Sequence, residues 1–347
     1  MDNTATPSKR AGWKNALLYA LVACVSVAVL LAVAGAGAFL WATSVADDLG
    51  APAQVPAALR VAMPSMTAGA SVGVAADPPR LEIELQDGQF EVVAGPPGSD
   101  VQVDGEYASN YYELVEEHGG ADGTSGSVTA IRLRPTSGIL VRMIALVRGS
   151  DNRSSEPNRL TVSIPTARPI ALMLNVSAGE SRIDLGGLSL TDLDAELTMG
   201  DHRLDFGRPL AGELRQLRIS GRMGNIELHH LGNARARELR ASSRMGNFTV
   251  DLSGAWRDDA VSDLVLNHSM GDLRLRIPSS VRISPDSENA AMFGESGRID
   301  RTRETADDSA PVLRLSLSTT MGETRIRRYD TDEPVDGLAA VVPAPVR

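Results

Sequence analysis

Leu217-Arg-Ile-Ser-Gly-Arg-Met-Gly-Asn-Ile-Glu-Leu228 decides the fold of this chain, because its pattern occurs six times in the second half of the sequence. Every copy has a leucine seven residues before a glycine, an apolar residue five before it and an aliphatic residue four after it. The glycines of the six copies are Gly179, Gly200, Gly224, Gly246, Gly271 and Gly322. Apolar residues that alternate in this way favour strands, and the glycine allows a positive φ between two of them.

The spacing of the copies indicates a repeat architecture. Consecutive glycines are 21, 24, 22, 25 and 51 residues apart, and we expect a degenerate copy at Gly294 between the last two. The sequence therefore predicts an all-β chain, a β-solenoid of roughly 21–25-residue coils with two short strands per coil. The alternative is an antiparallel sandwich of similar hairpins. Aligned columns of like residues favour the solenoid, because each residue then stacks on its counterpart about 4.8 Å away.

The residues beside each glycine predict the orientation of the turn. An acid or asparagine follows every glycine, and a methionine precedes it in five of the six copies. These methionines are Met199, Met223, Met245, Met270 and Met321. We expect the turns to be polar outside, with the methionines facing the apolar interior.

The N-terminal region predicts one transmembrane helix. Residues 15–44 contain no charged side chain, and a span needs about 20 residues. Trp13 and Trp41 bracket this run at positions typical of the two membrane interfaces. Basic residues precede the run, so we expect a cytoplasmic N-terminus and an extracytoplasmic C-terminal domain, periplasmic or at the cell surface. A cleaved signal peptide and a lipoprotein signal at Cys24 are the alternatives.

Composition excludes several functional classes. The only two lysines lie in the first 14 residues, which excludes a P-loop or a Schiff-base lysine beyond them. The net charge of −10 makes nucleic acid an improbable partner. The single cysteine permits no internal disulfide, and the five histidines show no metal-ligand spacing. We therefore expect no catalytic residues, no cofactor and no metal site.

Composition and periodicity also divide the chain. The copy from Leu81 to Val92 around Gly88 places the first coil near residue 80. We also interpret Glu113–Glu117 as a short helix. The predicted segments are a cytoplasmic N-terminus (1–14), a transmembrane helix (15–44), an Ala/Pro/Gly-rich tether (45–79), irregular first β coils (80–168), a regular β-solenoid (169–330) and a disordered tail (331–347).

Two columns of charged residues are the candidate surface features. Five residues after each glycine the register predicts a ladder in which Asp205 and Asp251 flank His229. Such flanking raises a histidine pKa and suits cation binding or pH sensing, whereas the simpler interpretation is a solvated charge ladder. Three residues after the glycines lies an arginine column that suits either an anionic wall polymer or pairing with the acidic turn positions. Its members are Arg182, Arg203, Arg274 and Arg325.

The chain resembles the toastrack family of bacterial β-solenoid domains, which are often described as adhesins. The resemblance covers about 80–330 and rests on the strand 160–165 ending in Ile-Pro, the following coil, and the Gly-Asp, Gly-Asn or Gly-Glu turns through Gly322. The chain differs in using Met-Gly at its turns, and 101–149 matches poorly. A membrane segment before such a domain is also similar to accessory proteins of envelope-stress responses.

These observations predict a non-catalytic, membrane-anchored binding or regulatory module of the bacterial cell envelope. Its expected partners are the membrane, through residues 15–44, and an envelope protein or cell-wall polymer. One alternative is a structural scaffold that self-associates coil to coil, because the ends of a solenoid expose strand edges. The other is an enzyme acting on polysaccharides, for which the ladder around His229 would be the site.

Overall fold

The computed structural model describes residues 36–45, 54–63, 78–119, 127–138, 140–142, 144, 158–257, 261–284, 287–293 and 310–330. The chain divides into two compact units, Met1–Ala53 with Thr136–Ser155, and Gln54–Pro135 with Glu156–Arg347. In the first unit, residues 36–45 form a helix. No helix in the described ranges is long and apolar enough to cross a membrane. Most of the predicted span 15–44, and all of the predicted tail 331–347, lie outside these ranges.

The second unit is built from strands, apart from one short 3₁₀ helix, η1 (Leu231–Ala234), in its described part. In chain order the strands are β1 (Gln54–Val61), β2 (Arg80–Leu85), β3 (Gly88–Gly95), β4 (Val101–Ala108), β5 (Tyr112–Gly119), β6 (Val128–Pro135), β7 (Asn158–Pro165), β8 (Ile170–Val176), β9 (Gly179–Asp184), β10 (Leu190–Asp205), β11 (Gln216–His229), β12 (Glu238–Met245), β13 (Phe248–Asp251), β14 (Val261–Met270), β15 (Leu273–Pro278), β16 (Arg282–Ile283), β17 (Glu288–Phe293), β18 (Val312–Met321) and β19 (Thr324–Tyr329).

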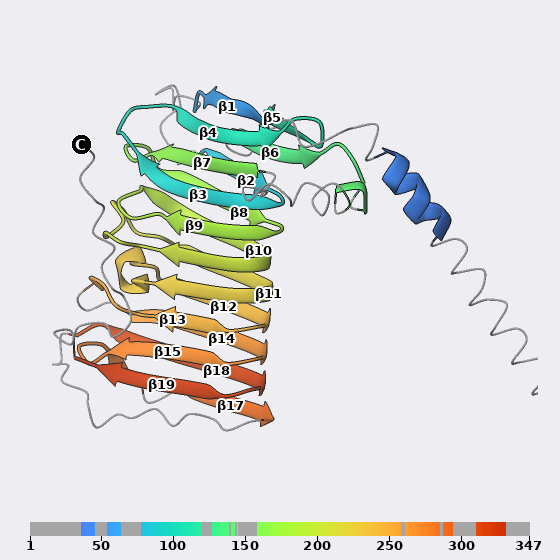
Figure 1. The fold of residues 1–347 in the computed structure, drawn as a ribbon. Coiled ribbons are helices and arrows are strands. Elements are labelled where there is room, and N and C mark those ends of the chain that lie inside the picture. The colour runs from blue at the N-terminus through green and yellow to red at the C-terminus, as the bar shows by residue number, and fades with distance from the viewer. Residues whose placement is uncertain are drawn as a thin grey trace, which may run out of the picture. The chain divides into compact units, whose positions relative to one another are not determined.

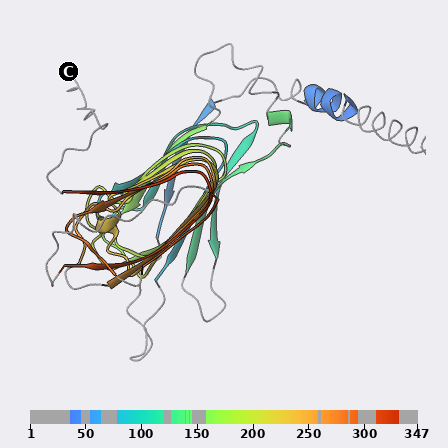
Figure 2. The same cartoon turned by 90° about the horizontal axis from the view of Figure 1, so that it is seen from below.

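The coils stack in parallel and in register, which confirms the predicted all-β, solenoid-like fold (Figure 1). The strands before the glycines form one face in the order β2, β8, β10, β11, β12, β14, β18. The strands after the glycines form the other face in the order β3, β9, β10, β11, β13, β15, β19. Strands β10 and β11 run through the turn and belong to both faces. Figure 2 looks along the stack and shows the two faces meeting at one edge.

The core lies between the two faces and is filled by the repeated leucines. Those seven residues before the glycines pair with one another from coil to coil and are at most 2% exposed. They are Leu172, Leu193, Leu217, Leu239, Leu264 and Leu315, and Leu81 continues the column. Burying a leucine side chain contributes about 1.5–3 kcal/mol, so this single column is a large part of the driving force for folding.

The glycine column forms the edge at which the two faces meet. The six repeated glycines have φ between 115° and 125°, and Gly88 continues their column by pairing with Gly179. A Cβ at Gly224 would lie 1.9 Å from the carbonyl oxygen of Gly200, and one at Gly246 would lie 1.9 Å from that of Gly224. Glycine is therefore required at these positions for two reasons. The backbone has a positive φ, and the neighbouring coil leaves no room for a Cβ.

The methionines do not face the interior, so that prediction is wrong. The five residues are between 42% and 50% exposed, and each pairs with the methionine of a neighbouring coil. Period-two alternation would turn the residue before the glycine inward, as it does for Leu193 and Leu197. The chain instead turns the corner at the glycine, which leaves the methionine on the outside of that corner.

Both long interruptions of the repeat fold onto the ends of the stack. Strand β14 pairs directly with β18, and β15 with β19, so no coil lies between the last two glycines in space. The expected copy near Gly294 is thus misplaced: β17 pairs with the outer edge of β18, and Gly294 itself is outside the described ranges. At the other end, β6 and β7 pair with the outer edges of β2 and β3, although they follow them in sequence.

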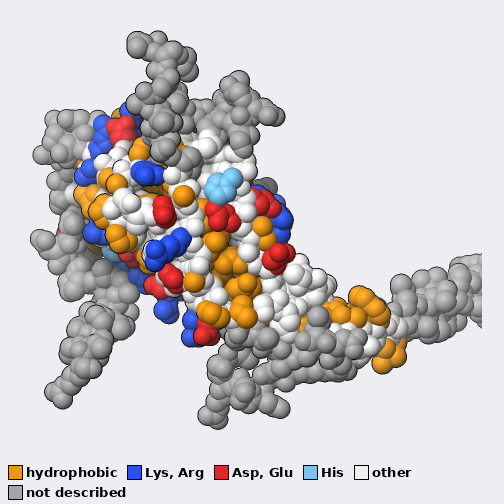
Figure 3. All heavy atoms as spheres, turned by 90° about the horizontal axis from the view of Figure 1, so that it is seen from above, with side chains coloured by type: hydrophobic (Ala, Val, Ile, Leu, Met, Phe, Trp, Pro, Cys, Tyr) orange, Lys and Arg blue, Asp and Glu red, His pale blue; other side chains and the backbone are white. Residues whose placement is uncertain are grey.

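The N-terminal end of the stack also contains antiparallel strands. Strand β5 includes Glu113–Glu117 and pairs with β6, so the predicted short helix is wrong. Strand β1 lies inside the predicted tether 45–79, because the edge of β4 provides hydrogen-bond partners for residues 54–61. Seen from this end, acidic, basic and apolar side chains are interspersed (Figure 3). Arg132, for example, pairs with Glu82, Glu84 and Glu117.

Candidate functional site

The candidate site lies where the strands after the glycines end, at the edge opposite the glycine column. The predicted ladder is in register there, since Asp205 pairs with both Asp184 and His229, and Asp251 pairs with Arg276. Two of the carboxylates accept hydrogen bonds within the turns that follow their strands. Asp184 accepts a hydrogen bond from a backbone N–H two residues on at 2.9 Å, and Asp251 does the same at 3.0 Å. These contacts support the simpler interpretation of the ladder as part of the strand ends.

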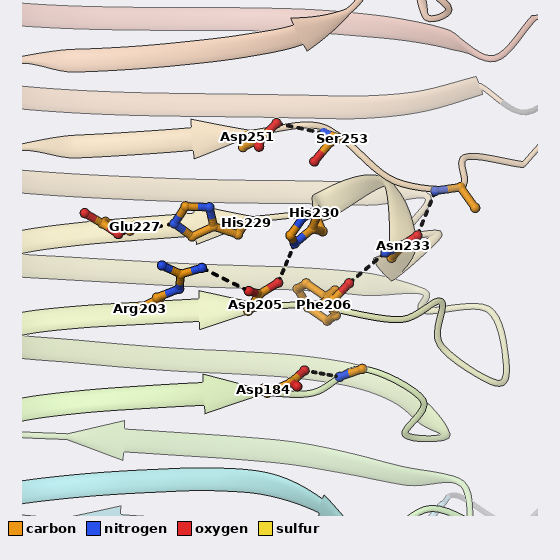
Figure 4. A network of polar contacts seen from close by, with 12 residues as sticks. Asp184, Arg203, Asp205, Phe206, Glu227, His229, His230, Asn233, Asp251 and Ser253 are labelled. Atoms are coloured by element: carbon orange, nitrogen blue, oxygen red, sulfur yellow. Dashed lines mark hydrogen bonds and ion pairs between the residues drawn. The ribbon is translucent and has the colours of Figure 1, made fainter. Parts of the chain in front are cut away.

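The strongest contact of the site joins Asp205 to His230 rather than to His229 (Figure 4). His230 Nδ1 lies 2.6 Å from Asp205 Oδ1, and Arg203 approaches the other carboxylate oxygen at 3.3 Å. His230 is the residue before η1 and has a left-handed backbone with φ of 53°. The repeat pattern does not predict this pair, because His230 lies just beyond the repeated part of the coil.

His229 makes a different contact, and the three ladder residues do not converge on one point. Its Nε2 lies 3.2 Å from Glu227 on the same strand. Asp251 instead accepts a hydrogen bond from the Tyr329 hydroxyl at 3.0 Å, and the Arg276 guanidinium lies 4.8 Å from the centre of the Tyr329 ring. Within the described ranges no three His, Cys, Asp or Glu side chains are arranged to hold a metal ion.

The surroundings of the pair shift both pKa values. The hydrogen bond to Asp205 raises the pKa of His230, and the negative charges of Asp205 and Asp251 act in the same direction, although burial opposes them. Burial opposes ionisation of Asp205 as well, but His230 and Arg203 together outweigh it and lower the pKa of this carboxyl group. The two groups therefore form an ion pair at pH values between the lowered pKa of Asp205 and the raised pKa of His230.

Asn233 joins the loops of three successive coils next to this pair (Figure 4). Its side-chain amide donates to the carbonyl oxygen of Phe206 at 2.7 Å, and its side-chain oxygen accepts from the N–H of Ala255, also at 2.7 Å. Its backbone N–H donates to the carbonyl oxygen of His230 at 2.9 Å. The buried asparagine thus fixes η1 against the coils on either side.

Two other histidines lie inside the stack near the glycine edge. His202 is buried and its Nδ1 lies 2.9 Å from the Ser181 hydroxyl one coil earlier. His268 is buried beside Phe248, with ring centres 6.0 Å apart. Burial lowers the pKa of each, so both are held neutral at neutral pH. His202 occupies the inward position that Ile226 fills in the next coil, and His268 the one that Val176 and Leu197 fill in earlier coils. The repeat alignment could therefore have identified both as buried.

The arginine column pairs with acidic residues only in part as expected. Arg325 pairs with Glu323, which is an acidic turn residue, through contacts of 2.6 Å. Arg203 instead pairs with Asp205 at the end of its strand. The column is interrupted between these two arginines by Glu227 and Thr249, which occupy the same register.

Comparison with known proteins finds one family model that matches part of the chain. Residues 80–229 match the family described as the N-terminal domain of toast_rack, DUF2154. The search of curated proteins gave no match.

Solved structures with a similar arrangement include three bacterial proteins. A candidate cell adhesion protein from Clostridium sporogenes is 11% identical with a TM-score of 0.36, and 80% of this chain and 100% of that chain are covered. A candidate adhesin from Bacteroides fragilis is 12% identical with the same TM-score and coverage. A candidate lipid-binding protein from Parabacteroides distasonis is 12% identical with a TM-score of 0.23, and 80% of this chain and 97% of that chain are covered.

Proposed function

We propose that this chain, which matches the toast_rack family model through residues 80–229, is a non-catalytic binding module of the bacterial cell envelope. Residues 15–44 would anchor it in the cytoplasmic membrane, with the stacked coils on the outer side. The uncharged length of that segment and the basic residues before it support both the anchor and the orientation. The coils would then act by holding a partner, as either a structural or a regulatory contact.

The exposed methionine column carries the proposal. It presents five large apolar side chains in one line on the corner of the stack, each between 42% and 50% exposed. The register places them about 4.8 Å apart, so the column is roughly 20 Å long. Aligned exposed apolar side chains mark interaction surfaces, and the unbranched, polarizable methionine adapts to the shape of a partner.

The residues after the glycines give the column a polar border. Acids occupy both ends and asparagines the middle, where Asn225 donates to Asp201 at 2.8 Å and Asn247 to Asn225 at 3.0 Å. An apolar centre with a hydrogen-bonded polar rim is the usual composition of a protein–protein interface. We therefore propose an envelope protein as the partner of this surface.

A crosslinking experiment tests the proposal with the intact chain in its own membrane. We expect the wild-type chain to capture a defined partner protein and the double variant Met223→Gln/Met245→Gln to lose it. Met173→Gln is the matched control, because Met173 is 38% exposed on β8 but lies outside the column. Equal capture by all three chains would show that the column is not the interface and would remove the basis of the proposal.

The membrane arrangement needs its own test. We expect the chain to stay in the membrane pellet after alkaline extraction, and its β-strand unit to be digested by protease added to spheroplasts. Release by alkali, or protection until the membrane is opened, would contradict the anchor or the orientation respectively.

Self-association is the second candidate function, and one observation favours it. Strand β19 pairs with β15 on one side, and no other described strand pairs with it. An open edge of this kind pairs readily with another strand, here that of a second copy. Sedimentation of the detergent-solubilised chain would show a concentration-dependent dimer if this edge is used, and a monomer at all concentrations if it is not.

A further inference from the structure

We infer that a pocket beside η1 binds a sugar that carries a phosphate or carboxylate group. The inference deepens the proposed binding function by naming a ligand class, but it concerns a different surface from the methionine column. The pocket has a volume of about 260 Å³ and lies between the segment after η1 and the start of β14. The residues that line it include Arg235, Arg237, Trp256 and Arg257.

The charge of the pocket is the first argument. Three guanidinium groups line it, whereas the whole chain has a net charge of −10. Among the described residues, Glu213 pairs with two of them, contacting Arg237 at 2.7 Å and also contacting Arg257. The excess of positive charge favours an anionic ligand, and guanidinium groups bind the oxygens of phosphate and carboxylate through paired hydrogen bonds.

Arg235 provides the second argument. Its Nε is buried and has no hydrogen-bond partner among the described residues. Leaving a buried charged donor unpaired is costly, so this position is suited to an oxyanion that supplies the acceptor. The residue is held by its backbone, since Arg235 ends η1 in the left-handed conformation and its N–H donates to the carbonyl oxygen of Gly232 at 3.3 Å.

Trp256 provides the third argument, because it indicates that the ligand has an apolar surface as well as an anionic group. Its indole N–H donates to the carbonyl oxygen of Leu252 at 2.7 Å, so the ring has only apolar carbon atoms left to offer the pocket. Val261, which is 46% exposed, adds further apolar surface. A Cβ at Gly232 would lie 2.5 Å from the indole nitrogen, and glycine at that position therefore permits the ring to sit there.

Together these features match a small ring with one anionic substituent. The apolar face of a sugar packs on an aromatic ring, while its phosphate or carboxylate reaches the arginines. The pocket is close to the lower limit of about 300 Å³ for ligand sites, which suits a single sugar unit. A lone inorganic anion would leave the tryptophan unused, and a neutral sugar would leave the arginines unused.

Fluorescence titration of the full-length chain tests the inference. The variant Trp13→Phe/Trp41→Phe leaves Trp256 as the single tryptophan, so its emission reports on the pocket. We expect glucose 6-phosphate, glucuronate or both to give a saturable change, with glucose and inorganic phosphate binding at least tenfold more weakly. The two anionic sugars distinguish a phosphate source from a carboxylate source.

Two substitutions that should change the affinity in opposite directions distinguish a binding role of the pocket from a structural one. Arg235→Gln should weaken binding roughly tenfold, because it removes a charge-assisted hydrogen bond. Glu213→Gln should tighten binding several-fold, since it removes the carboxylate that competes for Arg237 and Arg257. Arg240→Gln is the matched control, because this exposed arginine pairs with Glu238 and does not line the pocket.

Two results would overturn the inference. One is the absence of a saturable signal with either anionic sugar up to millimolar concentration, in a chain whose circular dichroism and unfolding midpoint are normal. The other is binding that Arg235→Gln leaves unchanged while Arg240→Gln weakens it. Neither result affects partner capture by the methionine column, so failure here and failure of the proposed binding function are distinguishable.

Discussion

The imidazole of His230 and the carboxylate of Asp205, 25 residues apart in sequence, lie 2.6 Å apart because successive coils place them side by side. The contact joins the end of one coil to the start of the loop that follows the next. It therefore couples the protonation of a single histidine to the packing between two coils.

Stability should fall with rising pH because of this pair. The folded pKa of His230 is raised above its ordinary value of 6.5, so the folded state binds the proton more tightly than the unfolded state. The contribution is fully present below 6.5 and is lost as pH rises through the folded pKa. Since the pair is partly exposed, we expect at most about 1 kcal/mol. Urea unfolding between pH 5.5 and 8.5 should show that the stability difference between wild type and His230→Gln is largest at the acid end and shrinks as the pH rises.

The buried histidines should act in the opposite direction. The folded pKa values of His202 and His268 are lowered, so the unfolded state binds more protons and stability is lost as pH falls below 6.5. We expect His268→Leu to reduce the acid sensitivity of the unfolding midpoint, because leucine suits an inward position. His118→Gln is the control, since His118 is exposed on β5. Unchanged acid sensitivity in His268→Leu would contradict a role for this ring.

The glycine column should tolerate no side chain. Gly224→Ala places a Cβ 1.9 Å from the carbonyl oxygen of Gly200 at a residue with φ of 122°, and we expect a loss of about 3–5 kcal/mol. Gly212→Ala is the comparison, because a Cβ there meets no atom within 4 Å. The thermal unfolding midpoint of Gly224→Ala should be clearly lower than that of Gly212→Ala. Similar midpoints would show that the neighbouring coil can move to accommodate the added methyl group.

Substituting the buried Asn233 should destabilise the protein more than substituting an exposed asparagine such as Asn225. Asn233→Asp removes the donor to the carbonyl oxygen of Phe206 and introduces a buried charge, so we expect a loss of about 2–3 kcal/mol. Asn225→Ala removes only exposed hydrogen bonds and should cost less than about 1 kcal/mol. Hydrogen exchange should also show faster opening around η1 in Asn233→Asp alone.

The repeat could be predicted from sequence because stacking in register forces like residues onto like. The column from Leu172 to Leu315 is visible in the sequence for that reason, and the structure buries it throughout. The position of the methionines could not be predicted in the same way. Alternation describes a straight strand, whereas Met223 lies where the chain turns a corner.

Most contacts of the candidate site could not be predicted from the sequence. The His230–Asp205 pair, the bridge made by Asn233 and the pocket beside Trp256 all depend on loops between coils. These loops differ in length and composition, so no column aligns them and no spacing connects Arg235 with Arg257. The order of strands at the two ends could not be predicted from the sequence either, because sequence order and spatial order differ there.

That difference in order has an evolutionary consequence. The segments that cover the outer edges of β2, β3 and β18 come from within the chain, between the first two coils and between the last two. Within the described residues, the strands of the middle coils therefore pair with strands of coils of the same pattern. A duplication or deletion of one whole coil between Gly200 and Gly271 would leave both closures intact, so the height of such a protein can change by single steps while its ends stay the same.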